Sequence, residues 1–232
     1  MYSYEKGEKM RNKHLIILSV IFVSVALLLF LIVKGLKSIK VDAFKPASVI
    51  FVIDSSASNQ GNLHNQKKFV KQLCSTLDPE DHVKIIKVSE DAYLIYEGTP
   101  QNSSGIMKSM DAFTQFAPED RGTAYGDGMK KAIQHSLTMK QNGYTPAIIV
   151  IGDLENEGAT SKQINWNTLP DNIKKAMQDA PDLSMAFLYA HPEKLDFVKE
   201  KLNPLLGEDK LTLSTEQTID KVPAKVMHAI GR

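Results

Sequence analysis

Short apolar segments alternate with amphipathic helical patterns over most of the chain, and this alternation restricts the fold more than any other feature. Four apolar segments are too short for buried helices, and the first three are rich in β-branched residues, so they predict buried strands at residues 48–53, 83–88, 147–151 and 184–190. Between them, three-to-four spacing of apolar residues predicts helices at residues 63–77, 122–139 and 170–177. Strands that alternate with helices predict an α/β fold with a doubly wound, mainly parallel sheet and helices on both faces.

Two further patterns complete this sheet. Residues 92–96 follow the second predicted strand after a turn that contains Glu90 and Asp91, which predicts a hairpin and one antiparallel edge strand. A last strand is predicted at residues 211–213, followed by a C-terminal helix at residues 216–230 that Pro223 interrupts.

A separate apolar run covers residues 15–33 without a charge, proline or glycine. As a helix it would span about 28 Å, close to the hydrocarbon thickness of a bilayer. Its apolar core is longer than that of a secretory signal. The sequence therefore predicts an N-terminal tail (1–14), a transmembrane helix (15–33), a stalk (34–45) and a globular domain (46–232).

The orientation in the membrane is predicted from the lengths of the segments before and after the apolar run. Basic residues flank the apolar run on both sides, so their count does not decide the topology. A short tail before a long folded domain favours a single-pass protein with the domain on the extracytoplasmic side.

The charge balance and the cysteine content argue against a nucleic-acid-binding protein and against a disulfide-linked domain. The 28 basic and 27 acidic residues give a net charge of +1, so no nucleic acid partner is predicted. Cys74 is the single cysteine, which excludes an internal disulfide, and its helical spacing from apolar neighbours predicts packing in the core.

Oxygen-bearing side chains gather where the predicted strands end. Asp54, Ser56 and Ser58 follow the first strand, Asp153 follows the strand at 147–151, and Thr123 precedes a helix. Ligands bind outside the carboxyl ends of strands in open α/β sheets. An all-oxygen set suits Mg²⁺, Mn²⁺ or Ca²⁺ rather than zinc. Capping of a turn and helix would also explain the first three residues, but not the other two.

These segments resemble von Willebrand factor type A domains. The stretch VIFVIDSSAS is similar to the family's Asp-x-Ser-x-Ser strand and loop, which opens its metal-ion-dependent adhesion site. RGTAYGDG from Arg121 is similar to the family's Gly-Gly-Thr segment, and VIGD to the strand that delivers its last aspartate. Two positions depart from the family pattern: Arg121 replaces the first glycine of the pair, and Gly152 stands where many members have threonine.

The resemblance implies a cation site and a function. Ser56, Ser58 and Thr123 would coordinate the ion through hydroxyls, and Asp54 and Asp153 directly or through water. The ion, Mg²⁺ with Mn²⁺ or Ca²⁺ as alternatives, would keep an open position for an acidic group of a partner protein. The expected function is therefore cation-dependent protein binding or adhesion at a membrane, without catalysis.

Two other functions stay open at this point. A metal-dependent phosphotransferase or hydrolase also places an aspartate after the first strand, but it needs a second acid where this chain has Ser56. A structural scaffold component of a membrane complex would not need the cation. The sequence does not identify the partner.

Overall fold

The sheet has the predicted architecture. In the computed structural model, which describes residues 25, 45–113, 122–155 and 159–232, the strands follow the spatial order β3-β2-β1-β4-β5-β6. Neighbouring strands are parallel except for the pair of β2 with the edge strand β3. The mainly parallel sheet with one antiparallel edge strand is thus confirmed. The strands are β1 (Ala47–Asp54), β2 (His82–Val88), β3 (Ala92–Gly98), β4 (Thr145–Ile151), β5 (Ser184–Leu188) and β6 (Leu211–Ser214).

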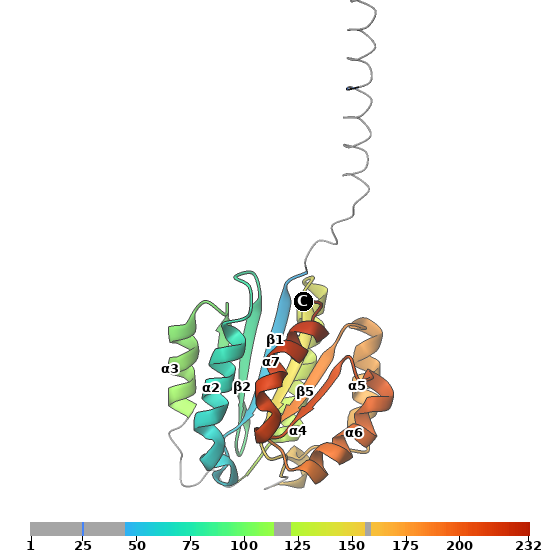
Figure 1. The fold of residues 1–232 in the computed structure, drawn as a ribbon. Coiled ribbons are helices and arrows are strands. Elements are labelled where there is room, and N and C mark those ends of the chain that lie inside the picture. The colour runs from blue at the N-terminus through green and yellow to red at the C-terminus, as the bar shows by residue number, and fades with distance from the viewer. Residues whose placement is uncertain (1–24, 26–44, 114–121, 156–158) are drawn as a thin grey trace, which may run out of the picture. The chain divides into compact units, whose positions relative to one another are not determined.

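Helices cover both faces of this sheet (Figure 1). Every residue of β1 is buried, because the strand lies in the middle of the sheet and its alternate side chains enter opposite cores. Ile50 and Val52 pack on the side of α4, α5 and α6, whereas Phe51 packs on the side of α2, α3 and α7. The helices are α2 (Leu63–Cys74), α3 (Ser103–Phe113), α4 (Tyr125–Gln141), α5 (Leu169–Asp179), α6 (Pro192–Leu206) and α7 (Val222–Ala229).

Two of these helices, α3 and α6, were not predicted from the sequence. The signal for α6 was present, since its buried residues Leu195, Val198, Leu202 and Leu206 recur every three or four positions. Pro192 lies in its first turn, where proline is tolerated, but Pro204 lies inside the helix.

Two predicted elements end differently in the structure. The strand predicted at 184–190 stops at Leu188, because Tyr189 adopts a left-handed backbone conformation with φ of 69°. The predicted C-terminal helix is divided into a 3₁₀ helix, Glu216–Lys221, and α7. Pro223 lies in the first turn of α7 and so begins this helix rather than interrupting it.

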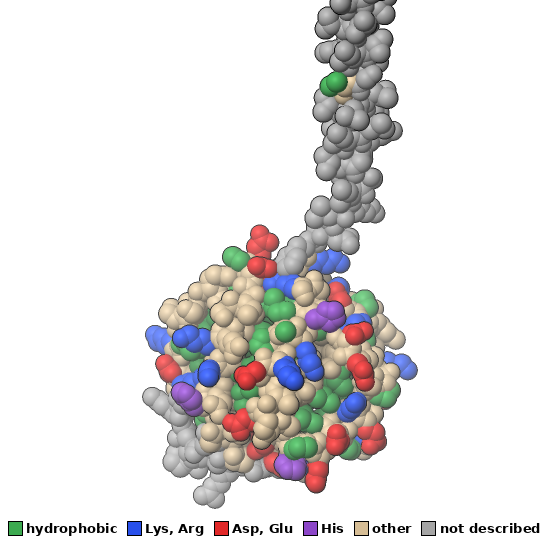
Figure 2. All heavy atoms as spheres, viewed as in Figure 1, with side chains coloured by type: hydrophobic (Ala, Val, Ile, Leu, Met, Phe, Trp, Pro, Cys, Tyr) green, Lys and Arg blue, Asp and Glu red, His purple; other side chains and the backbone are tan. Residues whose placement is uncertain are grey.

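The predicted membrane segment lies outside the described residues apart from Val25. Among the residues that the structure does describe, no helix combines the length and the apolar character needed to cross a bilayer. Residues 45–232 form one unit of the chain. Figure 2 shows acidic and basic side chains interspersed over the visible face of this unit, as the balanced composition leads one to expect.

Candidate metal site at the carboxyl edge of the sheet

The central strand β1 delivers the first candidate residue, Asp54, to the carboxyl edge of the sheet. Asp54 is the last residue of β1 and pairs in register with Val88 at the end of β2. The chain then turns while still bonded to β2, because the Ser55 amide donates to the Val88 carbonyl oxygen at 2.8 Å. The Asn59 side chain donates to the Asp54 carbonyl oxygen at 2.8 Å and holds the loop against the strand end.

The carboxylate of Asp54 is fully buried and accepts hydrogen bonds from two neutral donors. The backbone amide of Ser56 donates to Oδ1 at 2.8 Å, and the Tyr125 hydroxyl donates to Oδ2 at 3.0 Å. Burial raises the pKa of the Asp54 carboxyl to about 7, and the negative charge of Asp153 adds to this effect. A bound cation would favour the ionised carboxylate.

Three more candidate residues are joined to Asp54 by hydrogen bonds. The hydroxyls of Ser56 and Ser58 lie 3.0 Å apart, and the Ser58 hydroxyl donates to Asp153 Oδ2 at 2.8 Å. Asp153 follows β4, and its Oδ1 accepts the Glu155 amide at 2.9 Å. The chain of contacts runs from buried Asp54 and Ser56 to exposed Ser58, so the cluster opens to solvent.

Thr123 lies in the loop that leads into α4 and is not bonded to this chain of four residues. Its hydroxyl is buried and has no hydrogen-bond partner among the residues the structure describes. The loop is held by the Ala124 amide, which donates to the Ser89 carbonyl oxygen at 2.7 Å. A buried hydroxyl without a partner is costly unless a ligand satisfies it. Arg121, the departure from the glycine pair, lies outside the described residues.

Tyr125 has a role at this edge that was not predicted from the sequence. Tyr125 is the first residue of α4 and is fully buried. Its hydroxyl donates to Asp54 and accepts the Leu154 amide at 3.2 Å. Burial, followed by the charges of Asp54 and Asp153, raises the pKa of this phenol well above its usual value, so the hydroxyl stays protonated.

Gly152 makes room for the Tyr125 hydroxyl. A Cβ atom added at Gly152 would lie 2.1 Å from this hydroxyl and 2.5 Å from Cβ of Asp54, closer than real Cβ atoms approach other atoms. The backbone φ of 152° at Gly152 also favours glycine. The second departure from the family pattern therefore has a physical reason in this chain.

The donor set fits a hard divalent cation. No group of three or more histidine, cysteine, aspartate or glutamate side chains within the described part of the chain could hold a metal ion. Any cation at this edge would need hydroxyl oxygens from Ser56, Ser58 or Thr123 in addition to the two carboxylates. The unpartnered Thr123 hydroxyl is consistent with that requirement.

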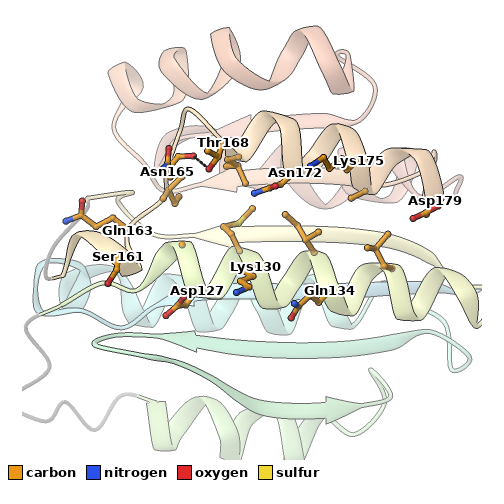
Figure 3. Close-up of a pocket in the computed structure, with 17 residues that line it drawn as sticks. Asp127, Lys130, Gln134, Ser161, Gln163, Asn165, Thr168, Asn172, Lys175 and Asp179 are labelled. Carbon is orange, nitrogen blue, oxygen red and sulfur yellow. Dashed lines mark hydrogen bonds between the residues drawn. The ribbon is translucent and has the colours of Figure 1, made fainter.

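A cavity of about 480 Å³ lies elsewhere, between α4 and α5 (Figure 3). Its lining includes Lys130 and Gln134 from α4 and Asn172 and Lys175 from α5. None of the five candidate ligands lines it. The cavity therefore does not form part of the cluster at the sheet edge.

Comparison with known proteins defines the class. Residues 49–156 match the family model of the von Willebrand factor type A domain. With the sheet order, this match shows that the chain contains a von Willebrand factor type A domain. Such domains are generally protein-interaction modules. Comparison of the sequence with curated proteins gives no match.

Solved structures with low sequence identity share the fold. The chain is similar to the conserved hypothetical protein BatB from Bacteroides thetaiotaomicron, with 17% identity, a TM-score of 0.55, and coverage of 79% of this chain and 98% of BatB. It is also similar to the pilus adhesin SpaC from Lactobacillus rhamnosus GG, with 14% identity, a TM-score of 0.57 and coverage of 81% and 30%. A von Willebrand factor type A protein from Catenulispora acidiphila has 15% identity, a TM-score of 0.53 and coverage of 80% and 42%.

Proposed function

We propose that the domain binds a partner protein through a divalent cation, Mg²⁺ with Mn²⁺ or Ca²⁺ as alternatives. Five residues would coordinate the ion: Asp54, Ser56, Ser58, Thr123 and Asp153. The observation that carries the proposal is the hydrogen-bonded chain from Asp54 through the two serines to Asp153. The buried Thr123 hydroxyl, which has no hydrogen-bond partner among the described residues, supports it.

The chemistry of these side chains explains how a partner would be recognised. Serine and threonine hydroxyls are neutral, so three of the five proposed ligands leave the charge of the ion uncompensated, unlike a shell made mainly of carboxylates. When bound, the cation supplies residual positive charge and an open coordination position for a carboxylate of the partner. Because Ser58 is exposed while Asp54 is buried, a partner would approach from the side of Ser58.

The place of the domain in the cell is part of the same proposal. Residues 15–33 would anchor the chain as a single transmembrane helix, with the domain extracytoplasmic. Protease treatment of intact cells tests this orientation. We expect loss of an epitope placed after Arg232, with a cytoplasmic protein left intact as the control. Protection of the epitope until the cells are lysed would place the domain inside.

Thermal unfolding of the purified full-length protein tests the cation directly. We expect Mg²⁺ to raise the melting temperature of the wild-type protein and EDTA to reverse the rise, because the ion binds only the folded state. Asp153→Asn should remove most of the rise, since it removes one of two charged ligands. Asp196→Asn changes an exposed carboxylate on α6 in the same way and should keep it. A wild-type protein that responds to neither Mg²⁺, Mn²⁺ nor Ca²⁺ would refute the proposal.

A further inference from the structure

The hydroxyl of Tyr125 links three segments that are far apart in the sequence. It belongs to the start of α4, donates to Asp54 at the end of β1, and accepts the amide of Leu154 after β4. Asp153 lies between Gly152, which contacts this hydroxyl, and Leu154, which donates to it. One side-chain oxygen therefore holds the backbone amide that follows Asp153 and one carboxylate oxygen of Asp54.

The backbone around Asp153 needs such a contact. Leu154 has a backbone φ of 60°, a left-handed conformation that residues other than glycine rarely adopt. A residue in this region costs about 1–2 kcal/mol relative to its usual conformation and persists when surrounding contacts hold it. The hydrogen bond from the Leu154 amide to Tyr125 is such a contact, and Leu154 itself is buried.

We propose that Tyr125 is a positioning residue of the cation site, an inference that rests on the proposed function. Its hydroxyl donates a hydrogen bond to Oδ2 of Asp54, and the Ser56 amide donates one to Oδ1. Both oxygens of Asp54 are therefore oriented by the protein. By holding Leu154, the same hydroxyl aims Asp153 at Ser58. Groups that orient metal ligands typically change metal affinity by 10–100-fold when they are removed.

The role of the hydroxyl can be separated from the packing of the ring. Phenylalanine fills the same space as tyrosine apart from the oxygen, so Tyr125→Phe removes two hydrogen bonds and leaves the ring in the core. Tyr96→Phe is the matched control, because Tyr96 is also buried. Tyr96 lies in β3, and its hydroxyl donates to the carbonyl oxygen of Thr99, just after this strand, at 2.8 Å. Both variants lose a tyrosine hydroxyl, but only one loses a contact at the site.

Isothermal titration of the full-length protein with MgCl₂ and MnCl₂ tests the proposal. We expect Tyr125→Phe to weaken binding by about 10–100-fold and Tyr96→Phe to leave it unchanged within about twofold. Amide hydrogen exchange without metal should become faster at Leu154 in Tyr125→Phe alone. Equal affinity in Tyr125→Phe and wild type would overturn the positioning role while leaving the proposed function intact. A wild type that binds neither ion would refute the proposed function instead.

A second variant perturbs the Tyr125 hydroxyl without removing it. Gly152→Ala keeps the hydroxyl but displaces it, because the added Cβ would lie 2.1 Å from it. We expect weaker Mg²⁺ binding in this variant as well. The double variant Gly152→Ala with Tyr125→Phe should lose less affinity than the product of the two single losses, since both changes disturb the bonds of the Tyr125 hydroxyl, although the overlap of the added Cβ with Asp54 remains. Fully multiplicative losses would contradict a shared mechanism.

Discussion

Two buried carboxylates lie at opposite ends of β1 and have different partners. At the amino end, Asp81 accepts the amides of Ala47 at 2.7 Å and Asp78 at 2.8 Å, and both of its oxygens pair with the guanidinium of Arg232. At the carboxyl end, Asp54 accepts the Ser56 amide and the Tyr125 hydroxyl, which are both neutral. The two side chains are equally buried, but within the described part of the chain only Asp81 pairs with a cationic side chain.

The difference separates a structural ion pair from the proposed cation site. Burial of a carboxylate is costly unless an opposite charge or several hydrogen bonds offset the lost hydration. Arg232 offsets this cost for Asp81. Burial raises the pKa of the Asp54 carboxyl to about 7, and the hydrogen bonds from its neutral donors oppose this rise only in part. An arrangement that leaves a carboxylate poorly stabilised in the folded protein alone is what a cation-binding role for Asp54 requires.

Removal of Arg232 should have the largest effect on stability. Arg232→Ala leaves Asp81 buried without its cation, and loss of one partner of a buried pair costs about 3–5 kcal/mol. Urea unfolding measures this loss. Lys201→Ala is the control, because Lys201 pairs with exposed Glu200, and it should cost less than about 1 kcal/mol. Equal losses in the two variants would show that the buried pair of Asp81 and Arg232 stabilises the fold no more than an exposed pair does.

Substitution of Gly152 should have the next largest effect, now at the carboxyl end. Gly152→Ala combines an unfavourable backbone conformation with overlap at Tyr125 and Asp54, and should cost about 3 kcal/mol. Gly143 also has a positive φ, of 90°, but a Cβ there would meet nothing within 4 Å. Gly143→Ala should therefore cost only about 1 kcal/mol in the same unfolding experiment. A similar cost at both glycines would show that Tyr125 moves aside easily.

Much of the fold could be predicted because its signals are local. The strand at 48–53 is short, apolar and followed by polar residues, so both its burial and the position of Asp54 at its end were readable. The helical spacing around Cys74 likewise predicted the core position that the structure confirms. The helix at 192–206 had the same kind of signal and was overlooked.

The part of the site that could not be predicted depends on contacts between distant segments. Tyr125 has the pattern of an ordinary buried helix residue, and nothing in its neighbours shows that its hydroxyl reaches Asp54. Gly152 was noted as a departure from the family, but its reason is the oxygen of a residue 27 positions earlier (152 minus 125). Such pairs become visible when the sheet brings the two segments to one edge.

Addition of Mg²⁺ should distinguish the two ends of β1, because substitutions at only one end should remove the stabilisation by the ion. At a free concentration about 100 times the dissociation constant, binding to the folded state alone adds about 2.7 kcal/mol to the free energy of unfolding. Asp54→Asn should remove most of this gain, whereas Arg232→Ala should keep it within about 0.5 kcal/mol, because Arg232 pairs with Asp81 at the other end of β1. Urea unfolding with Mg²⁺ and with EDTA measures both values. A gain lost equally in the two variants would show that the cation acts on the whole fold.

Replacement of Asp54 without any cation should have the smallest effect. In EDTA, Asp54→Asn removes a buried charge and keeps the bond from the Ser56 amide to the side-chain oxygen. The amide nitrogen can donate to the Tyr125 hydroxyl, whose own proton then loses its acceptor, so the relief of the charge and the loss of this bond oppose each other. The free energy of unfolding should therefore change by less than about 1 kcal/mol. Asp81→Asn, the same substitution at the other end, leaves the Arg232 guanidinium poorly paired and should cost about 3 kcal/mol. Equal costs for the two substitutions would mean that Asp54 is as well compensated as Asp81 in the protein alone, and the case for a cation at that edge would lose its electrostatic basis.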